Sequence, residues 1–243
     1  MLKCEIDHSG ECHSDDGSQT MVHEQFTGQH RRVGRAAAWG VSLLLIAYLV
    51  TLILGFLSLA SPLDPIGDPY FSILELLIVI IAPLMVIVMI AVHAYASPEG
   101  RMYSLTALAF MVILAGISCS VHFVILTVSR QIDAGGFPLI ILFLSFEWPS
   151  VVYALDILAW DVFFALSMLF AAPVFSMGRL EKTLRVLMIL SGVLSLAGLI
   201  GVPLANMNIR NIGIIGYAGI SIVVFLLLGI VFGRARRIPG EER

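Results

Sequence analysis

The sequence predicts an all-α polytopic membrane protein, a six-transmembrane-helix bundle with a short re-entrant or interfacial segment between helices 3 and 4. Hydrophobic residues make up 59% of the 243 residues and charged residues only 13%, whereas a soluble domain carries about 25% charged residues. Apolar runs of about 18 or more residues recur along the chain, and each is long enough to cross a bilayer as a helix. There is no basic stripe of the kind that binds nucleic acid, so no nucleic-acid partner is expected.

The bundle is expected to occupy residues 34–233, with a polar tail at each end. Residues 1–33 are acidic and rich in histidine, so we expect a disordered cytoplasmic tail there. Residues 234–243 form a short basic cytoplasmic tail. The six helices are expected at about 36–59, 70–96, 102–129, 153–175, 186–205 and 212–232. Among the connections are a basic turn at 178–185 and an asparagine-rich loop at 206–211.

Lysine and arginine fall almost entirely on one side of the predicted bundle. That side receives ten of them: Arg31, Arg32, Arg35, Arg101, Arg179, Lys182, Arg185, Arg234, Arg236 and Arg237. The other side receives two, Arg130 and Arg210. Because cytoplasmic loops carry the excess of Lys and Arg, the sequence predicts a multi-pass cell-membrane protein with both termini in the cytoplasm.

A short apolar segment at 137–148, FPLIILFLSFEW, follows the third predicted helix. It is only 12 residues long, whereas a membrane-spanning helix needs about 20, and Pro149 stops it. We therefore expect this segment to dip into the outer leaflet without crossing. It would place Glu147 and Trp148 over the polar residues described below.

Cysteine and histidine cluster near the start of the chain as Cys4, His8, Cys12 and His13. Thiolate and imidazole ligands of this kind suit a soft metal, but the spacing matches no standard zinc motif. The prediction is an unstructured tail without a metal site. No cofactor is predicted elsewhere in the chain.

Apart from His93 near the cytoplasmic end of the second helix, four acidic or histidine residues lie inside the predicted membrane helices: Glu75, His122, Asp156 and Asp161. With a rise of about 1.5 Å per residue, the first three share a layer roughly 6–10 Å below the outer ends of three helices, and Asp161 lies about 7 Å deeper. A carboxylate at membrane depth is tolerated mainly where it faces a partner or a wet cavity. Polar contacts between membrane helices stabilise only weakly, so four such residues predict a polar cavity open to the outside.

Helical spacing indicates which side chains share that cavity. Tyr153, Asp156 and Trp160 fall on one face of the fourth helix, and Glu147 would hang above them. Asp161 is turned about 140° away from Asp156, at about 100° per residue. The two aspartates are therefore predicted not to face the same point: one meets the histidine or the glutamate of the layer, and the other meets a different helix.

The stretch from Ser118 to His122 matches the Ser-x3-His element of the ceramidase and progestin-receptor-like membrane hydrolases, and it resembles that family over these five residues. Members of the family also carry an H-x3-H pair on a late helix, which completes a zinc site. The last two predicted helices contain no histidine, so the chain is not assigned to the family. The size of the chain and its intramembrane acids are loosely similar to those of the small membrane-bound terpene cyclases. No motif of the chain aligns with that family.

The favoured function is a small transporter or ligand-binding membrane protein in which Glu75, His122 and Asp156 bind a proton or a cation. Carboxylates and histidine at membrane depth are the usual parts of proton relays. The expected partners are the lipid bilayer and a small molecule, an ion or a lipid. Six helices are few for a transporter, so a homodimer is expected in that case.

Two other functions remain open. One is an intramembrane enzyme that performs acid/base chemistry on a lipid or isoprenoid, with Asp156 or Glu75 as the general acid and His122 as the base. The other is an accessory subunit without chemistry. An enzyme needs a closed apolar cavity at the acids, a transporter needs a path to both faces of the membrane, and a subunit needs neither.

Overall fold

Six long helices form the part of the protein that the structure describes, as the sequence predicts. A computed structural model describes residues 26–61, 64–129 and 142–235, in which there are helices and no strand. The helices that are long and apolar enough to cross a membrane are Gly28–Leu57, Tyr70–Tyr95, Pro98–Ser129, Val151–Val174, Gly178–Gly201 and Met207–Arg234. This confirms an all-α, multi-pass membrane bundle.

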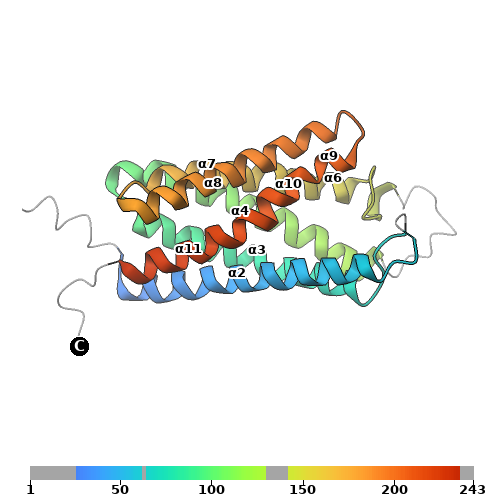
Figure 1. Cartoon of the computed structure of the whole chain (residues 1–243), viewed down its shortest axis with the longest axis horizontal. Coiled ribbons are helices and arrows are strands. Elements are labelled where there is room, and N and C mark those ends of the chain that lie inside the picture. Colours follow the sequence, from blue (N-terminus) through green and yellow to red (C-terminus); the bar gives the residue numbers. More distant parts are fainter. Residues whose placement is uncertain (1–25, 62–63, 130–141, 236–243) are drawn as a thin grey trace, which may run out of the picture.

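All six helices run along the long axis of the molecule (Figure 1). The first described helix begins and the last one ends at the same end of the bundle, which we call the termini end. The connecting residues 58–61, 64–69, 142–150 and 202–206 lie at the opposite end, which we call the loop end.

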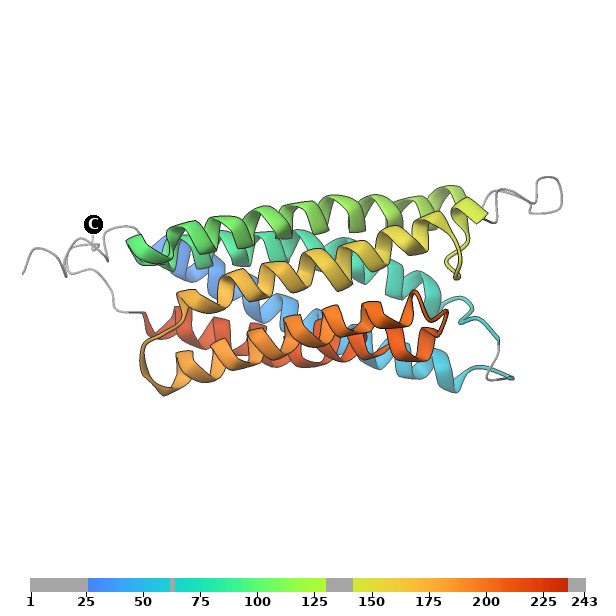
Figure 2. The ribbon, with the colours of Figure 1, turned by 90° about the horizontal axis from the view of Figure 1, so that it is seen from above.

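The helices close into a ring. The elements of the first three crossings are α2 (Gly28–Leu57), α3 (Tyr70–Tyr95), η1 (Pro98–Gly100), α4 (Arg101–Val124) and η2 (Ile125–Ser129). Those of the last three are α6 (Val151–Ile157), η3 (Leu158–Phe164), α7 (Ala165–Ala171), η4 (Ala172–Val174), α8 (Gly178–Gly198), η5 (Leu199–Gly201), α9 (Met207–Arg210), α10 (Ile212–Ile214), η6 (Ile215–Ile220) and α11 (Ser221–Arg234). Each crossing packs on the next one along the chain, and α11 returns to pack on α2. Figure 2 shows α4 and α7 together on one side and α8 beside α11 on the other.

The first helix begins earlier than the predicted position near residue 36, because the residues before the apolar run cap it well. The hydroxyl of Thr27 accepts a hydrogen bond from the backbone N–H of His30, and the backbone N–H of Thr27 donates to Nδ1 of that histidine. Such a reciprocal capping box satisfies N–H groups that lack partners at a helix start. The ring of Phe26 packs against Tyr95 and Phe232 and holds the helix start against the bundle.

The predicted basic turn at 178–185 and the predicted loop at 206–211 are wrong, because both stretches are largely helical. The basic stretch is the first part of α8, where the carboxylate of Glu181 accepts hydrogen bonds from the backbone N–H groups of Ser176 and Met177. In the asparagine-rich stretch, the side chain of Asn206 accepts hydrogen bonds from the N–H groups of Asn208 and Ile209 and starts α9. Hydropathy assigns the polar ends of these helices to loops. Local capping hydrogen bonds nevertheless keep those ends helical, so the helices are longer than predicted.

Three segments have π-helical winding, which the sequence did not predict: η2, η3 and η6. A π-helix pairs residue i with residue i+5, and it occurs mostly as a single-turn bulge, frequently at functional sites. Residues of η3 and η6 line the cavity described below.

Large apolar side chains fill the termini-end half of the bundle. Met85, Met89, Phe225 and Phe232 are fully buried there. The outer surface carries exposed apolar residues, such as Met102 at 81% exposure, because in a membrane protein the outward-facing side chains meet lipid.

Part of the predicted re-entrant segment, residues 137–141, lies outside the described residues, as does the Cys4–His13 cluster. The part from residue 142 onward lies against the loop end. The hydroxyl of Ser129 donates to the carbonyl oxygen of Leu144, and the ring of Phe146 packs against Tyr153. This connection therefore joins the end of the third crossing to the start of the fourth.

Candidate functional site

A cavity of about 690 Å³ lies at the loop end, between α2, α3, α6, η3 and η6. Its lining runs from residues 64–66 and 145–147 at the loop end down to Leu45 and Trp160. Most of the wall is apolar or aromatic, and its charged or ionisable groups come from Asp64, Glu75, His122, Glu147, Asp156 and Arg210. An apolar cavity with a few polar groups on its wall is the usual form of a small-molecule site.

Glu75 of α3 and His122 of α4 meet at this wall. Oε2 of Glu75 lies 2.6 Å from Nδ1 of His122, and the two side chains are 3% and 4% exposed. The two helices pack side by side, and both residues lie near their loop ends, as predicted from the helix rise. The structure therefore brings together two side chains that the sequence placed only in the same layer.

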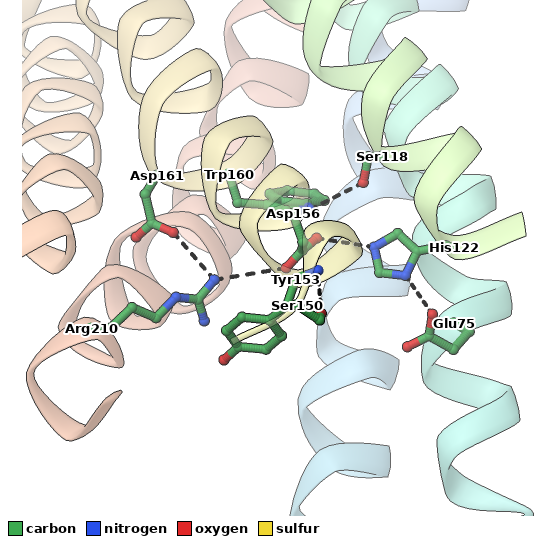
Figure 3. Close-up of polar contacts among 9 residues, drawn as sticks. All are labelled: Glu75, Ser118, His122, Ser150, Tyr153, Asp156, Trp160, Asp161 and Arg210. Carbon is green, nitrogen blue, oxygen red and sulfur yellow. Dashed lines mark hydrogen bonds and ion pairs between the residues drawn. The ribbon is translucent and has the colours of Figure 1, made fainter. Parts of the chain in front are cut away.

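Asp156 of α6 approaches the other nitrogen of the same ring, with 3.2 Å between Nε2 of His122 and Oδ1 of the aspartate (Figure 3). A neutral imidazole has one N–H donor and one acceptor nitrogen, so it donates to only one of two flanking carboxylates. A favourable second contact requires an imidazolium ring or a protonated carboxylic acid. Glu75, His122 and Asp156, which we call the Glu–His–Asp triad, thus place one buried imidazole ring between two carboxylates.

Arg210 of α9 is the residue that sequence reasoning missed. Its Nη2 atom lies 3.2 Å from Oδ2 of Asp161 and 3.7 Å from Oδ2 of Asp156, and the side chain is 4% exposed. Its guanidinium also lies 5.5 Å from the ring centre of Tyr153 and 5.8 Å from that of Tyr217. The sequence did carry a signal for this residue. Arg210 is one of only two basic residues on the side of the predicted bundle that is otherwise depleted of Lys and Arg, and it borders an apolar helix.

Asp161 of η3 corrects the prediction that the two aspartates cannot face the same point. Both carboxylates reach Nη2 of Arg210, as Figure 3 shows. The predicted angle assumed an α-helix throughout, whereas π-helical winding begins at Leu158, between the two aspartates, and changes the angle. The second part of the prediction is right. Asp156 meets His122 of the polar layer, and Asp161 meets Arg210 on a different helix.

Two glycines make room for the carboxylate of Asp161, which has no exposed surface. A Cβ atom built on Gly198 of α8 would lie 2.7 Å from Oδ1 of Asp161, and one on Gly213 of α10 would overlap the same oxygen. Neither position tolerates a side chain without a shift of the aspartate. Close approach of α8 and α10 thus encloses the Arg210–Asp161 pair.

The remaining candidate residues all reach the cavity. Trp160 is buried, and its Nε1 donates a hydrogen bond of 3.1 Å to the hydroxyl of Ser118. Trp160 lines the cavity together with Tyr153 and Asp156, the two residues that were predicted to share its helix face. Tyr153 lies on the wall beside Arg210. Glu147 is exposed and lines the cavity at the loop end.

Among the residues that the structure describes, no group of three or more His, Cys, Asp or Glu side chains is arranged to hold a metal ion. Comparison of the chain with known protein families, curated proteins and solved structures finds no match.

Proposed function

We propose that this protein is a ligand-binding membrane protein of the transporter kind, which takes a small molecule into the loop-end cavity and binds a proton or a cation other than a metal ion at the Glu–His–Asp triad. The observation that carries the proposal is the position of the triad. Its three buried side chains form part of the wall of a cavity that is large enough for a small molecule.

The cost of these charges favours a function over a purely structural role. Replacing a buried ion pair with apolar side chains of similar volume is often neutral or stabilising, and polar contacts between membrane helices average about 0.6 kcal/mol. Five buried ionisable side chains, on α3, α4, α6, η3 and α9, are more than helix packing needs. These side chains are Glu75, His122, Asp156, Asp161 and Arg210.

The cavity is proposed to open to the outside of the cell. Basic residues lie at the termini end, where Arg35 is near the start of α2, Arg101 begins α4 and Arg234 ends α11. By the positive-inside rule, that end faces the cytoplasm. Buried apolar side chains fill the cytoplasmic half, so transport would require a second conformation in which that half opens.

A second candidate is an intramembrane enzyme, and the 2.6 Å contact of Glu75 with His122 favours it. A histidine oriented by a carboxylate beside an apolar cavity is the arrangement of a general base. An experiment can distinguish the enzyme from the binding protein. An enzyme would return a chemically changed molecule, whereas a binding protein would return its ligand intact.

A matched pair of tryptophan substitutions on α2 tests the proposal. Leu52 lines the cavity, whereas Leu54 is 45% exposed on the outer surface. Wild-type protein, Leu52→Trp and Leu54→Trp would be purified in the same way, and co-purifying small molecules identified by mass spectrometry after extraction.

We expect at least one molecule that is retained by wild type and by Leu54→Trp and is lost from Leu52→Trp. Uptake of that molecule into proteoliposomes would then establish transport, and its recovery in altered form would favour the enzyme. If the three preparations carry the same molecules in the same amounts, the cavity does not bind a ligand.

A further inference from the structure

We propose that the ligand of the cavity is an organic cation, an amine or quaternary ammonium group on an apolar body, whose charge is held between the triad carboxylates and aromatic rings. This inference rests on the proposed function, since it names the chemical class of the molecule that the cavity takes. Three properties of the cavity wall support it: its charge, its aromatic content and the way in which it already holds a cation.

The part of the wall that the structure describes carries more negative than positive charge. Among those residues, four carboxylates line the cavity, namely Asp64, Glu75, Glu147 and Asp156, against one permanent cation, Arg210. Arg210 is itself paired at 3.2 Å with a fifth carboxylate behind the wall, Asp161. A cationic ligand therefore reduces the charge imbalance of this wall, whereas an anion would increase it.

The protein already binds one organic cation of its own in this manner. The guanidinium of Arg210 lies within 6 Å of the ring centres of Tyr153 and Tyr217, and within ion-pair distance of Asp156. Carboxylate and aromatic face together are the usual partners of an organic cation. The other carboxylate oxygen of Asp156, Oδ1, faces His122, and both residues line the cavity.

The rest of the lining suits an apolar body. Tyr48, Phe71 and Trp160 add aromatic surface, and Leu45, Leu52 and Ile78 add aliphatic surface. A volume of about 690 Å³ lies within the range of about 300–1,000 Å³ that small-molecule pockets occupy. An inorganic cation would leave this apolar surface unused, so the lining favours an amphiphilic cation.

The test compares three ligands of nearly equal shape on full-length protein in lipid nanodiscs, with empty nanodiscs as the blank. The cation is benzyltrimethylammonium, the neutral analogue is neopentylbenzene, in which carbon replaces nitrogen, and the anion is phenylmethanesulfonate. Affinity would be measured by titration calorimetry. We expect the cation to bind at least about tenfold more tightly than either analogue, the difference that one well-placed charge contact supplies.

Matched variants locate the effect. Asp156→Asn and Glu75→Gln should each weaken the cation about tenfold or more and leave the neutral analogue unchanged, whereas Glu99→Gln should change neither, because Glu99 is an exposed carboxylate of η1 at the termini end. The comparison of ligands on wild-type protein remains decisive even if a triad variant fails to fold.

Each remaining outcome overturns the inference in a recognisable way. Equal affinity for the cation and the neutral analogue, with both blocked by Leu52→Trp, would reject the cationic class and keep the cavity. Tighter binding of the sulfonate would assign the site to anions held by Arg210. Binding of none of the three probes would reject the cationic class, while the co-purification experiment would still report separately on the cavity. Binding that Leu52→Trp leaves unchanged would place the cation elsewhere and count against the proposed function itself.

Discussion

The guanidinium of Arg210 lies 3.2 Å from the carboxylate of Asp161, and both side chains are buried. They come from α9 and η3, segments far apart in the sequence. Arg210 also lines the cavity, and its Nη2 atom lies 3.7 Å from Oδ2 of Asp156 in the Glu–His–Asp triad.

Arg210→Gln should destabilise the protein by about 3–5 kcal/mol, because it leaves Asp161 buried without its cationic partner. The double variant Arg210→Gln/Asp161→Asn should recover much of that loss, since no uncompensated charge remains. Unfolding in mixed detergent would measure both, with Arg179→Gln at an exposed position of α8 as the control. A double variant less stable than Arg210→Gln would contradict the pairing.

Asp156→Asn and Glu75→Gln should leave the melting temperature of the purified protein nearly unchanged and weaken the binding of a cationic ligand about tenfold or more. Each removes a charge but keeps the shape of the side chain, and the desolvation penalty of that charge disappears with it. Thermal melts and binding assays on the same preparations would measure the two effects. If both variants fail to accumulate in the membrane, the triad is structural.

Gly213→Ala should lower the free energy of unfolding by about 1–3 kcal/mol, the usual cost of overpacking. The new Cβ would overlap Oδ1 of Asp161. Gly219→Ala is the matched control in the same crossing, because its nearest neighbour, Cγ2 of Ile215, would lie 3.9 Å away. We expect the control to be neutral or slightly stabilising, since alanine favours helix over glycine. Equal effects of the two substitutions would mean that α10 does not pack closely on Asp161.

Ser118→Ala should cost about 1–3 kcal/mol of stability, because the buried indole N–H of Trp160 loses its acceptor. The control is Ser120→Ala on the exposed face of α4, where the hydroxyl bonds only to the carbonyl oxygen of Gly116 in its own helix. Chemical unfolding and the fluorescence of Trp160 would report the change. An unchanged emission spectrum and an unchanged stability would argue against this contact.

Reporter fusions test the orientation of the bundle. Fusions after residues 65, 135 and 208 should read outside the cell, and fusions after residues 99, 180 and 240 should read inside, because the basic residues concentrate at the termini end. A fusion at the C-terminus that reads outside would reverse this topology and place the cavity on the cytoplasmic face.

The sequence by itself determined the number of crossings and the depth of the polar layer. Hydropathy and length identify each crossing, because a bilayer demands about 20 apolar residues. The constant rise of a helix then sets how far each residue lies from the helix end. Glu75, His122 and Asp156 were therefore predicted to share a layer, and the structure finds them in contact.

Tertiary structure alone decided which side chains pair across that layer. Rotation about each helix axis depends on packing against neighbours, and the π-helical winding of η3 turned Asp161 toward a partner that ideal α-helical spacing excludes. Arg210 lies in a polar stretch that hydropathy assigns to a loop, yet α9 packs it against η5 and α8 and buries its charge. Depth is a local property of a helix, whereas the choice of an ionic partner is a property of the assembled bundle.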